Sequence, residues 1–235
     1  MRWQLACLGM AGTTIRDGGL VEQAVTVAVA GQGVVPGTAE HERMLAVVRK
    51  TMGRSNIEVF RLLLDGDERR ARAANAEFEQ AYGLLVDDGA IEPVPGVVEA
   101  ISTLRESGVK VALTTGFARS TQNAVLDALG WHGLIDLALS PADAGRGRPY
   151  PDLVLVAALR LGVEDVARIA VAGDTPLDVI AGRRAGAGLV AGVLTGAADA
   201  TELRAAGATT VIDSVAGLPA LMGVGRPAAV YPQAV

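Results

Sequence analysis

Cysteine and lysine are almost missing from this chain of 235 residues. Its single cysteine, Cys7, has no partner for an internal disulfide, so the fold does not depend on an oxidising compartment. Lysine occurs only at Lys50 and Lys110, so arginine supplies nearly all of the positive charge. We therefore expect a cytoplasmic protein whose cationic chemistry depends on arginine.

Aromatic residues are also scarce, and net positive charge and long apolar runs are absent. Aromatic residues make up 3% of the chain and the formal net charge is -5, which offers nucleic acid neither stacking surfaces nor an attractive field. No apolar run approaches the ~20 residues that cross a bilayer. A chain that is 50% hydrophobic and 20% charged is nevertheless too apolar to be disordered. We expect a globular protein with no nucleic-acid or membrane partner.

Short β-branched runs alternate with helical stretches from residue 91 onward, which is the pattern of βαβ units around a parallel sheet. The predicted strands are Gln4 to Leu8, Val109 to Leu113, Leu134 to Leu139, Arg168 to Ala172, Leu189 to Leu194 and Thr209 to Ile212. The sequence thus predicts an α/β fold with a Rossmann-like, doubly wound parallel sheet. Such sheets bind ligands where loops leave the carboxyl ends of the strands.

Residues 18 to 90 contain no strand pattern and read as consecutive amphipathic helices. The predicted helices are Leu20 to Ala30, Thr38 to Thr51, Asn56 to Leu64 and Glu68 to Leu85. A helical block between the first strand and the rest of the sheet indicates an inserted domain. We divide the chain into an α/β core (1–17 plus 91–222), a helical insertion (18–90) and a loosely held tail (223–235).

The strongest chemical signal is an apolar strand that ends in Gly173-Asp174 and is followed by Asp178. Four residues are about one helical turn, so both carboxylates are expected to face one site at a helix start. Paired carboxylates there suit a magnesium ion that also contacts phosphate. On the motif alone, an alternative is equally good: Asp178 caps the helix and Asp174 serves a turn.

Three other strand ends carry notable residues. Thr115 and Gly116 follow a strand and offer a hydroxyl and backbone N–H groups to phosphate oxygens, although a threonine helix cap has the same appearance. Arg148 follows a glycine-rich loop, where an arginine is otherwise a solvated surface charge. The first strand runs into the glycine-bearing segment Gly9 to Thr14.

Together and in this order, these segments resemble the four motifs of the haloacid dehalogenase superfamily, over nearly the whole chain. In that family the first motif opens with an aspartate that attacks phosphorus, the second supplies Thr or Ser, the third Lys or Arg, and the fourth the metal-binding acids. The resemblance assigns these positions to Gly9, Thr115, Arg148, and Asp174 with Asp178. It also implies phosphate binding by Thr115, Gly116 and Arg148, and Mg²⁺ binding by Asp174, Asp178 and the Ala11 backbone carbonyl.

Within the superfamily the chain resembles the phosphonatase branch, the phosphonoacetaldehyde hydrolases and their relatives. Ala11 stands where most phosphatases of the superfamily have a second aspartate as general acid and base. The run Ala11 to Thr14, the arginine of the third motif and the segment Met52 to Arg61 point the same way. In phosphonoacetaldehyde hydrolase a lysine of the helical cap forms a Schiff base with the substrate aldehyde, and the resemblance places Asn56 at that position.

Both departures from the family pattern remove chemistry. Gly9 offers no side chain either as nucleophile or as metal ligand, and Asn56 cannot form an imine. Loss of a nucleophile costs several orders of magnitude in rate, and Mg²⁺ affinity should fall. Cys7 shares the sheet face of Gly9, where a buried inert thiol is favoured over a replacement nucleophile.

Three functions therefore stay open. The first is a phosphonatase-like hydrolase acting on a small phosphorylated or phosphonylated metabolite between cap and core, with activity impaired or absent because of Gly9. The second is a natural non-hydrolytic protein that binds such a ligand or runs a different reaction in the same pocket. The third is a scaffold in which two copies pair through apolar cap helices. Retention of Thr115, Arg148, Asp174 and Asp178 argues against an inert scaffold.

Overall fold

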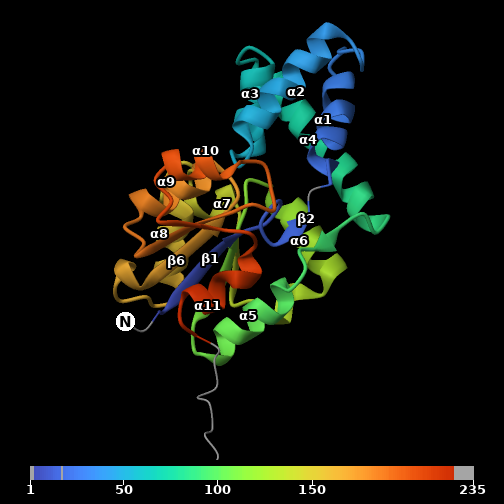
Figure 1. Cartoon of the computed structure of the whole chain (residues 1–235). Helices are drawn as coiled ribbons and strands as arrows, with labels where there is room; N and C mark the ends of the chain where they lie inside the picture. Colours follow the sequence, from blue (N-terminus) through green and yellow to red (C-terminus); the bar gives the residue numbers. More distant parts are fainter. Residues whose placement is uncertain (1–2, 17, 225–235) are drawn as a thin grey trace, which may run out of the picture.

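The structure is a computed structural model, which describes residues 3–16 and 18–224 (Figure 1). Its centre is a six-stranded sheet in the order β5-β4-β1-β6-β7-β8, with every neighbouring pair parallel. The strands are β1 (Leu5–Gly9), β4 (Lys110–Thr114), β5 (Leu137–Leu139), β6 (Ile169–Gly173), β7 (Leu189–Val193) and β8 (Thr210–Ile212). The predicted fold class is confirmed.

Alternate side chains of each strand pack on opposite faces of the sheet, as the pleat requires. Ala6 and Leu8 of β1 belong to a core cluster with helices α5 and α11, whereas Leu5 and Cys7 pack in a second cluster with α8, α9 and α10. The helices of the core are α5 (Val97–Glu106), α6 (Arg119–Leu129), α7 (Pro141–Ala144), α8 (Asp152–Arg160), α9 (Pro176–Arg184), α10 (Ala200–Ala205) and α11 (Leu218–Leu221). Burial on both faces explains why the strands read as continuous apolar runs.

Four helices form a separate bundle beyond the carboxyl edge of the sheet (Figure 1). They are α1 (Leu20–Ala30), α2 (Ala39–Thr51), α3 (Asn56–Leu63) and α4 (Glu68–Asp87), which we call the cap. The hydroxyl of Thr38 accepts the N–H of His41, and the Asp67 carboxylate accepts that of Arg70, so each residue caps the helix that follows. Thr38, predicted as the first residue of a helix, is therefore its cap.

An aromatic cluster joins the cap to the core. Phe78 and Tyr82 of α4 stack at 5.7 Å between ring centroids, and both lie against Phe117, which follows β4. Phe60 of α3 meets the edge of Phe78 at 5.9 Å. The three cap rings and Phe117 are buried, so this cluster anchors the long helix α4 to the sheet.

Two short elements escaped the sequence analysis. Strand β2 (Ile15–Arg16) pairs antiparallel with β3 (Glu92–Pro93), where the chain leaves the core and returns to it. Strand β5 begins at Leu137 instead of Leu134, because a 3₁₀ turn (Trp131–Gly133) precedes it.

The boundaries of the core, insertion and tail stay a prediction; Asp17 and residues 225–235 of the tail lie outside the described residues. Among the described helices, none has the length and apolarity to cross a membrane.

Candidate active site

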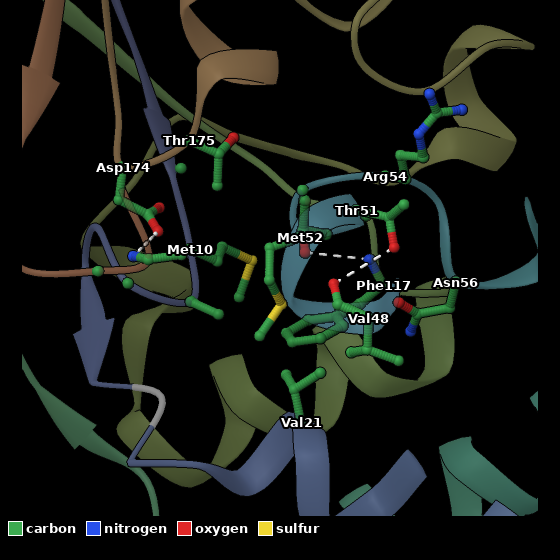
Figure 2. Close-up of a pocket in the computed structure, with 18 of the residues that line it drawn as sticks. Met10, Val21, Val48, Thr51, Met52, Arg54, Asn56, Phe117, Asp174 and Thr175 are labelled. Carbon is green, nitrogen blue, oxygen red and sulfur yellow. Dashed lines mark hydrogen bonds between the residues drawn. The ribbon is translucent and has the colours of Figure 1, made fainter. Parts of the chain in front are cut away.

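The register of the parallel strands brings three predicted site segments to one level. Gly9 at the end of β1 pairs with Thr114 at the end of β4, and Leu8 pairs with Ala172 of β6. A cavity of about 680 Å³ opens between this sheet edge and the cap. Every residue predicted for the site lines it: Gly9, Ala11, Asn56, Thr115, Gly116, Arg148, Asp174 and Asp178. Figure 2 shows Asp174 and Thr175 on one side of this pocket and Asn56 and Val48 on the other.

Arg148 is fixed by a buried ion pair. The Nε of Arg148 lies 2.6 Å from Oδ1 of Asp178. Both side chains are almost completely buried, with exposed fractions of 8% for Arg148 and 5% for Asp178. A terminal nitrogen of Arg148 donates to the carbonyl and the hydroxyl of Thr114, at 2.8 Å each. The interpretation of Arg148 as a solvated surface charge is therefore wrong.

Asp178 serves the helix and the arginine at once. Its Oδ2 accepts the Thr175 hydroxyl at 2.5 Å and the Thr175 N–H at 3.2 Å, in a reciprocal capping box at the start of α9. Because Oδ1 faces Arg148, both carboxylate oxygens are already engaged. The capping alternative describes Asp178 as the structure has it; direct coordination of Mg²⁺ by Asp178 stays a prediction.

Asp174 differs from Asp178, because no arginine or lysine of the described chain forms an ion pair with it. Its Oδ1 accepts the hydroxyl of Thr13 at 2.8 Å, and its Oδ2 accepts the N–H of Ala197 at 3.0 Å. Burial, followed by the charge of Asp178, raises the pKa of Asp174 to about 6. A buried carboxylate without a cationic partner is a suitable position for a bound cation.

The backbone requires glycine at one of two positions in the first motif but not at the other. Gly12 has φ +78°, and a Cβ there would overlap the carboxylate of Asp174, so the turn requires glycine. Gly9 has no left-handed φ, and the nearest atoms to a Cβ there belong to the side chain of Thr13, with its hydroxyl oxygen 2.7 Å away. The backbone therefore does not require glycine at position 9. A side chain could stand there if Thr13 shifted.

Thr115 and Gly116 hold the core side of the pocket and touch the cap. The Thr115 hydroxyl oxygen accepts the N–H of Phe117 at 3.1 Å, which leaves its own proton to donate. A Cβ at Gly116 would overlap the carbonyl oxygen of Arg54, and the Asn56 N–H donates to the Gly116 carbonyl at 3.2 Å. The loop between α2 and α3 thus rests directly on the second motif.

Sequence reasoning missed the segment that follows β7. The Thr195 hydroxyl donates to the Gly12 carbonyl at 2.6 Å, and Ala197 donates to Asp174, so this segment ties the first motif to the fourth. The position of a strand end at the carboxyl edge of the sheet was the available signal. Cys7 is no substitute nucleophile, because burial raises the pKa of its thiol to about 12.

Comparison with known proteins identifies the family of the chain. Residues 4–186 match the family model described as haloacid dehalogenase-like hydrolase, and the chain belongs to that family. It is 30% identical over 219 residues to a phosphonoacetaldehyde hydrolase of Bacillus cereus (strain AH820), covering 85% of this chain and 78% of that protein. The resemblance to the phosphonatase branch is confirmed by this similarity.

Solved structures share the fold over most of the chain. A hydrolase from Pseudomonas syringae superimposes with a TM-score of 0.81 at 25% identity, covering 95% of this chain and 100% of that one. A phosphonoacetaldehyde hydrolase-like protein from Oleispira antarctica gives a TM-score of 0.81 at 25% identity, covering 95% of this chain and 92% of that one.

Proposed function

We propose that this protein binds a small phosphorylated or phosphonylated ligand between cap and core, and that with glycine at position 9 it has little or no hydrolytic activity of the family type. The convergence of Thr115, Arg148 and Asp174 at the sheet edge that ends in Gly9 carries this proposal. The natural non-hydrolytic alternative is the one we favour, because Thr115, Arg148 and Asp174 line the pocket whereas the attacking carboxylate and the imine-forming lysine of the family are both missing.

The head group of the ligand would lie against Thr115 and Arg148. Thr115 has a hydroxyl proton to donate, and Gly116, the next residue, also lines the cavity. The bonds of Arg148 to Asp178 and Thr114 use its Nε and one terminal nitrogen, so the other terminal nitrogen is available to an anion. Fixed donors of this kind orient a phosphoryl group without moving.

Charge balance at the core end of the cavity makes this binding depend on a cation. There, Asp174 and Asp178 carry two negative charges against the single positive charge of Arg148, so a dianionic head group would meet a net negative charge. Proteins of this family generally use Mg²⁺. Asp174 fits the ion, because it is buried and has no cationic partner in the described chain; the Ala11 carbonyl would assist. When bound, Mg²⁺ neutralises the head group, but with weakened affinity because Gly9 contributes no carboxylate.

Hydrolysis through a covalent intermediate lacks its attacking group. The family nucleophile position is occupied by Gly9, and the buried Cys7 thiol stays protonated with a pKa of about 12. The position equivalent to the imine-forming lysine is Asn56, whose amide is not nucleophilic. These residues support ligand binding, or a non-hydrolytic reaction in the enclosed pocket.

Calorimetric titration of the full chain with inorganic phosphate tests the binding site, with and without Mg²⁺. We expect binding with Mg²⁺ and at least tenfold weaker binding in EDTA. Thr115→Val, which removes the hydroxyl at constant shape, should weaken phosphate binding by roughly tenfold, about 1.4 kcal/mol. Thr103→Val on α5, outside the cavity, is the matched control and should leave affinity unchanged. No phosphate binding in either condition would refute the proposal.

Three further expectations belong to this proposal. The single cysteine is in keeping with a cytoplasmic protein. No nucleic-acid or membrane partner is expected. Pairing of two copies through the cap stays a prediction, which light scattering of the purified protein would test.

A further inference from the structure

The cap end of the cavity is apolar. Val21, Val48, Met52 and Phe60 of the cap line it, and they face Met10 and Phe117 of the core. Figure 2 shows the sulfur-bearing ends of Met10 and Met52 in the middle of the pocket, with Val21 and Phe117 beside them. A ligand that fills the cavity would therefore contact charged residues at the core end and apolar side chains at the cap end.

Most polar side chains at this end form hydrogen bonds or ion pairs with other groups of the protein. The Thr51 hydroxyl donates to the Val47 carbonyl at 2.8 Å, within its own helix. Glu22 and Arg49 form a two-pronged ion pair with each other, at 2.7 and 2.6 Å. The guanidinium of Arg54 points away from Met10 and Met52 in Figure 2 and borders an outer groove beside Tyr150. Thr51, Glu22 and Arg49 are therefore engaged within the protein, and the Arg54 guanidinium is turned outward.

Asn56 is the exception. Its side-chain nitrogen Nδ2 is buried and has no hydrogen-bond partner, although the residue lines the cavity. A buried amide N–H without an acceptor is costly, and an acceptor atom of a ligand would satisfy it. Asn56 lies opposite Asp174 across the pocket, so that acceptor belongs to the ligand's body and not to its anionic head (Figure 2).

We propose that the ligand is a phosphoryl or phosphonyl compound with an apolar body larger than a two-carbon chain and with one neutral acceptor oxygen, such as a carbonyl, facing Asn56. This inference rests on the proposed function and adds the chemical class of the ligand. A cavity of about 680 Å³ is of the size that holds drug-sized ligands. Each methylene buried on the wall adds roughly fourfold in affinity, whereas each ligand hydroxyl buried there loses its hydrogen bonds. The wall therefore favours an apolar body over a sugar.

Calorimetric titration of the full chain in Mg²⁺ with methylphosphonate, phenethylphosphonate and a glucose phosphate tests the apolar wall. We expect phenethylphosphonate to bind at least tenfold more tightly than either of the others. If phosphate and methylphosphonate bind but phenethylphosphonate binds no more tightly, the apolar ligand class is wrong while the proposed function stands. If none of the ligands binds, inorganic phosphate included, both are wrong.

A matched pair of ligands tests Asn56. Phenacylphosphonate differs from phenethylphosphonate by a carbonyl in place of a methylene, and we expect the wild-type chain to prefer it by about fivefold or more. Asn56→Leu, similar in shape, should abolish this preference and keep the preference for phenethylphosphonate over methylphosphonate. Asn75→Leu, on α4 and bonded to Glu79, is the control and should leave both preferences intact. A carbonyl preference that survives Asn56→Leu would overturn the role of Asn56.

Discussion

The two ends of the cavity are built on different principles. The core end consists of loops that leave β1, β4 and β6, and the sheet register sets where its residues lie. The cap end consists mainly of apolar side chains, and the Asn56 Nδ2 atom is buried there without a hydrogen-bond partner. The difference teaches that the backbone places the residues of the core end, whereas individual side chains line the cap end, where we propose that selectivity is set. On the function that we propose, a single replacement at Gly9 removes a reaction and leaves the binding site in place.

The largest effect on stability should come from the core end. Arg148→Ala leaves Asp178 buried without its cation, and we expect a loss of ~3–5 kcal/mol in the free energy of unfolding. Arg146→Ala removes an arginine of the same loop, whose exposed pair with Asp152 should be worth about 1 kcal/mol or less. Urea denaturation of both variants measures the difference. Equal losses would show that burial of the Arg148 pair has no special weight.

The raised pKa of Asp174, at the core end, predicts that the free energy of unfolding depends on pH. Its folded pKa of about 6 lies above the ordinary value of 3.8, so folding favours the protonated form. The protonated carboxyl is therefore stabilising at acidic pH, and this contribution is lost as the pH rises through 6. A difference of about two pKa units corresponds to at most ~3 kcal/mol.

Urea unfolding in EDTA between pH 4.5 and 7.5 measures that dependence. We compare the slope of stability against pH for wild type and Asp174→Asn, because the amide also loses the bond from Ala197 and changes the absolute value. The wild-type curve should fall relative to the variant as the pH rises, and Mg²⁺ should reduce the fall. Parallel curves would contradict the raised pKa.

Gly116→Ala tests the contact between the two ends. The added methyl group would overlap the carbonyl of Arg54, so the cap loop must move away from the second motif. We expect a loss of roughly 1–3 kcal/mol and faster hydrogen exchange in the loop between α2 and α3. Gly133→Ala, where a Cβ meets nothing within 4 Å, is the control and should change neither quantity.

The smallest effect should come from a single side chain of the apolar wall. Met52→Ala is expected to weaken phenethylphosphonate binding by roughly tenfold, ~1.4 kcal/mol, and to leave inorganic phosphate binding within twofold. Met44→Ala, in helix α2 that ends just before Met52 and outside the cavity, serves as the control. Equal weakening of both ligands would mean that the two ends of the cavity are not separable.

The arrangement of elements was largely predictable, because periodicity reports which side chains are buried. The alternation of strands and helices predicted the sheet, and the ends of β1, β4 and β6 predicted where the site residues meet. Helix α1 has the predicted bounds. Strands β2 and β3 were missed because two residues carry no periodicity.

Pairing between distant residues was not predictable. The Arg148–Asp178 ion pair and the bond from Thr13 to Asp174 depend on side-chain directions that composition and spacing do not contain. The apolar wall of the cavity was not predictable either, because a valine that faces a cavity and one that faces the core follow the same sequence periodicity. Only the fold separates Val48 beside the pocket from a fully enclosed residue such as Ala28.

The most direct test of the central claim is Mg²⁺-dependent phosphate release from small phosphate esters and phosphonates by wild type, Gly9→Ala and Gly9→Asp. Gly9→Ala adds the Cβ that displaces Thr13 but no carboxylate, so it separates crowding from chemistry. The account predicts turnover by Gly9→Asp alone, at least a thousandfold above the other two. Turnover by the wild-type chain at a rate equal to that of Gly9→Asp would contradict it, because the reaction would then not need a carboxylate at position 9.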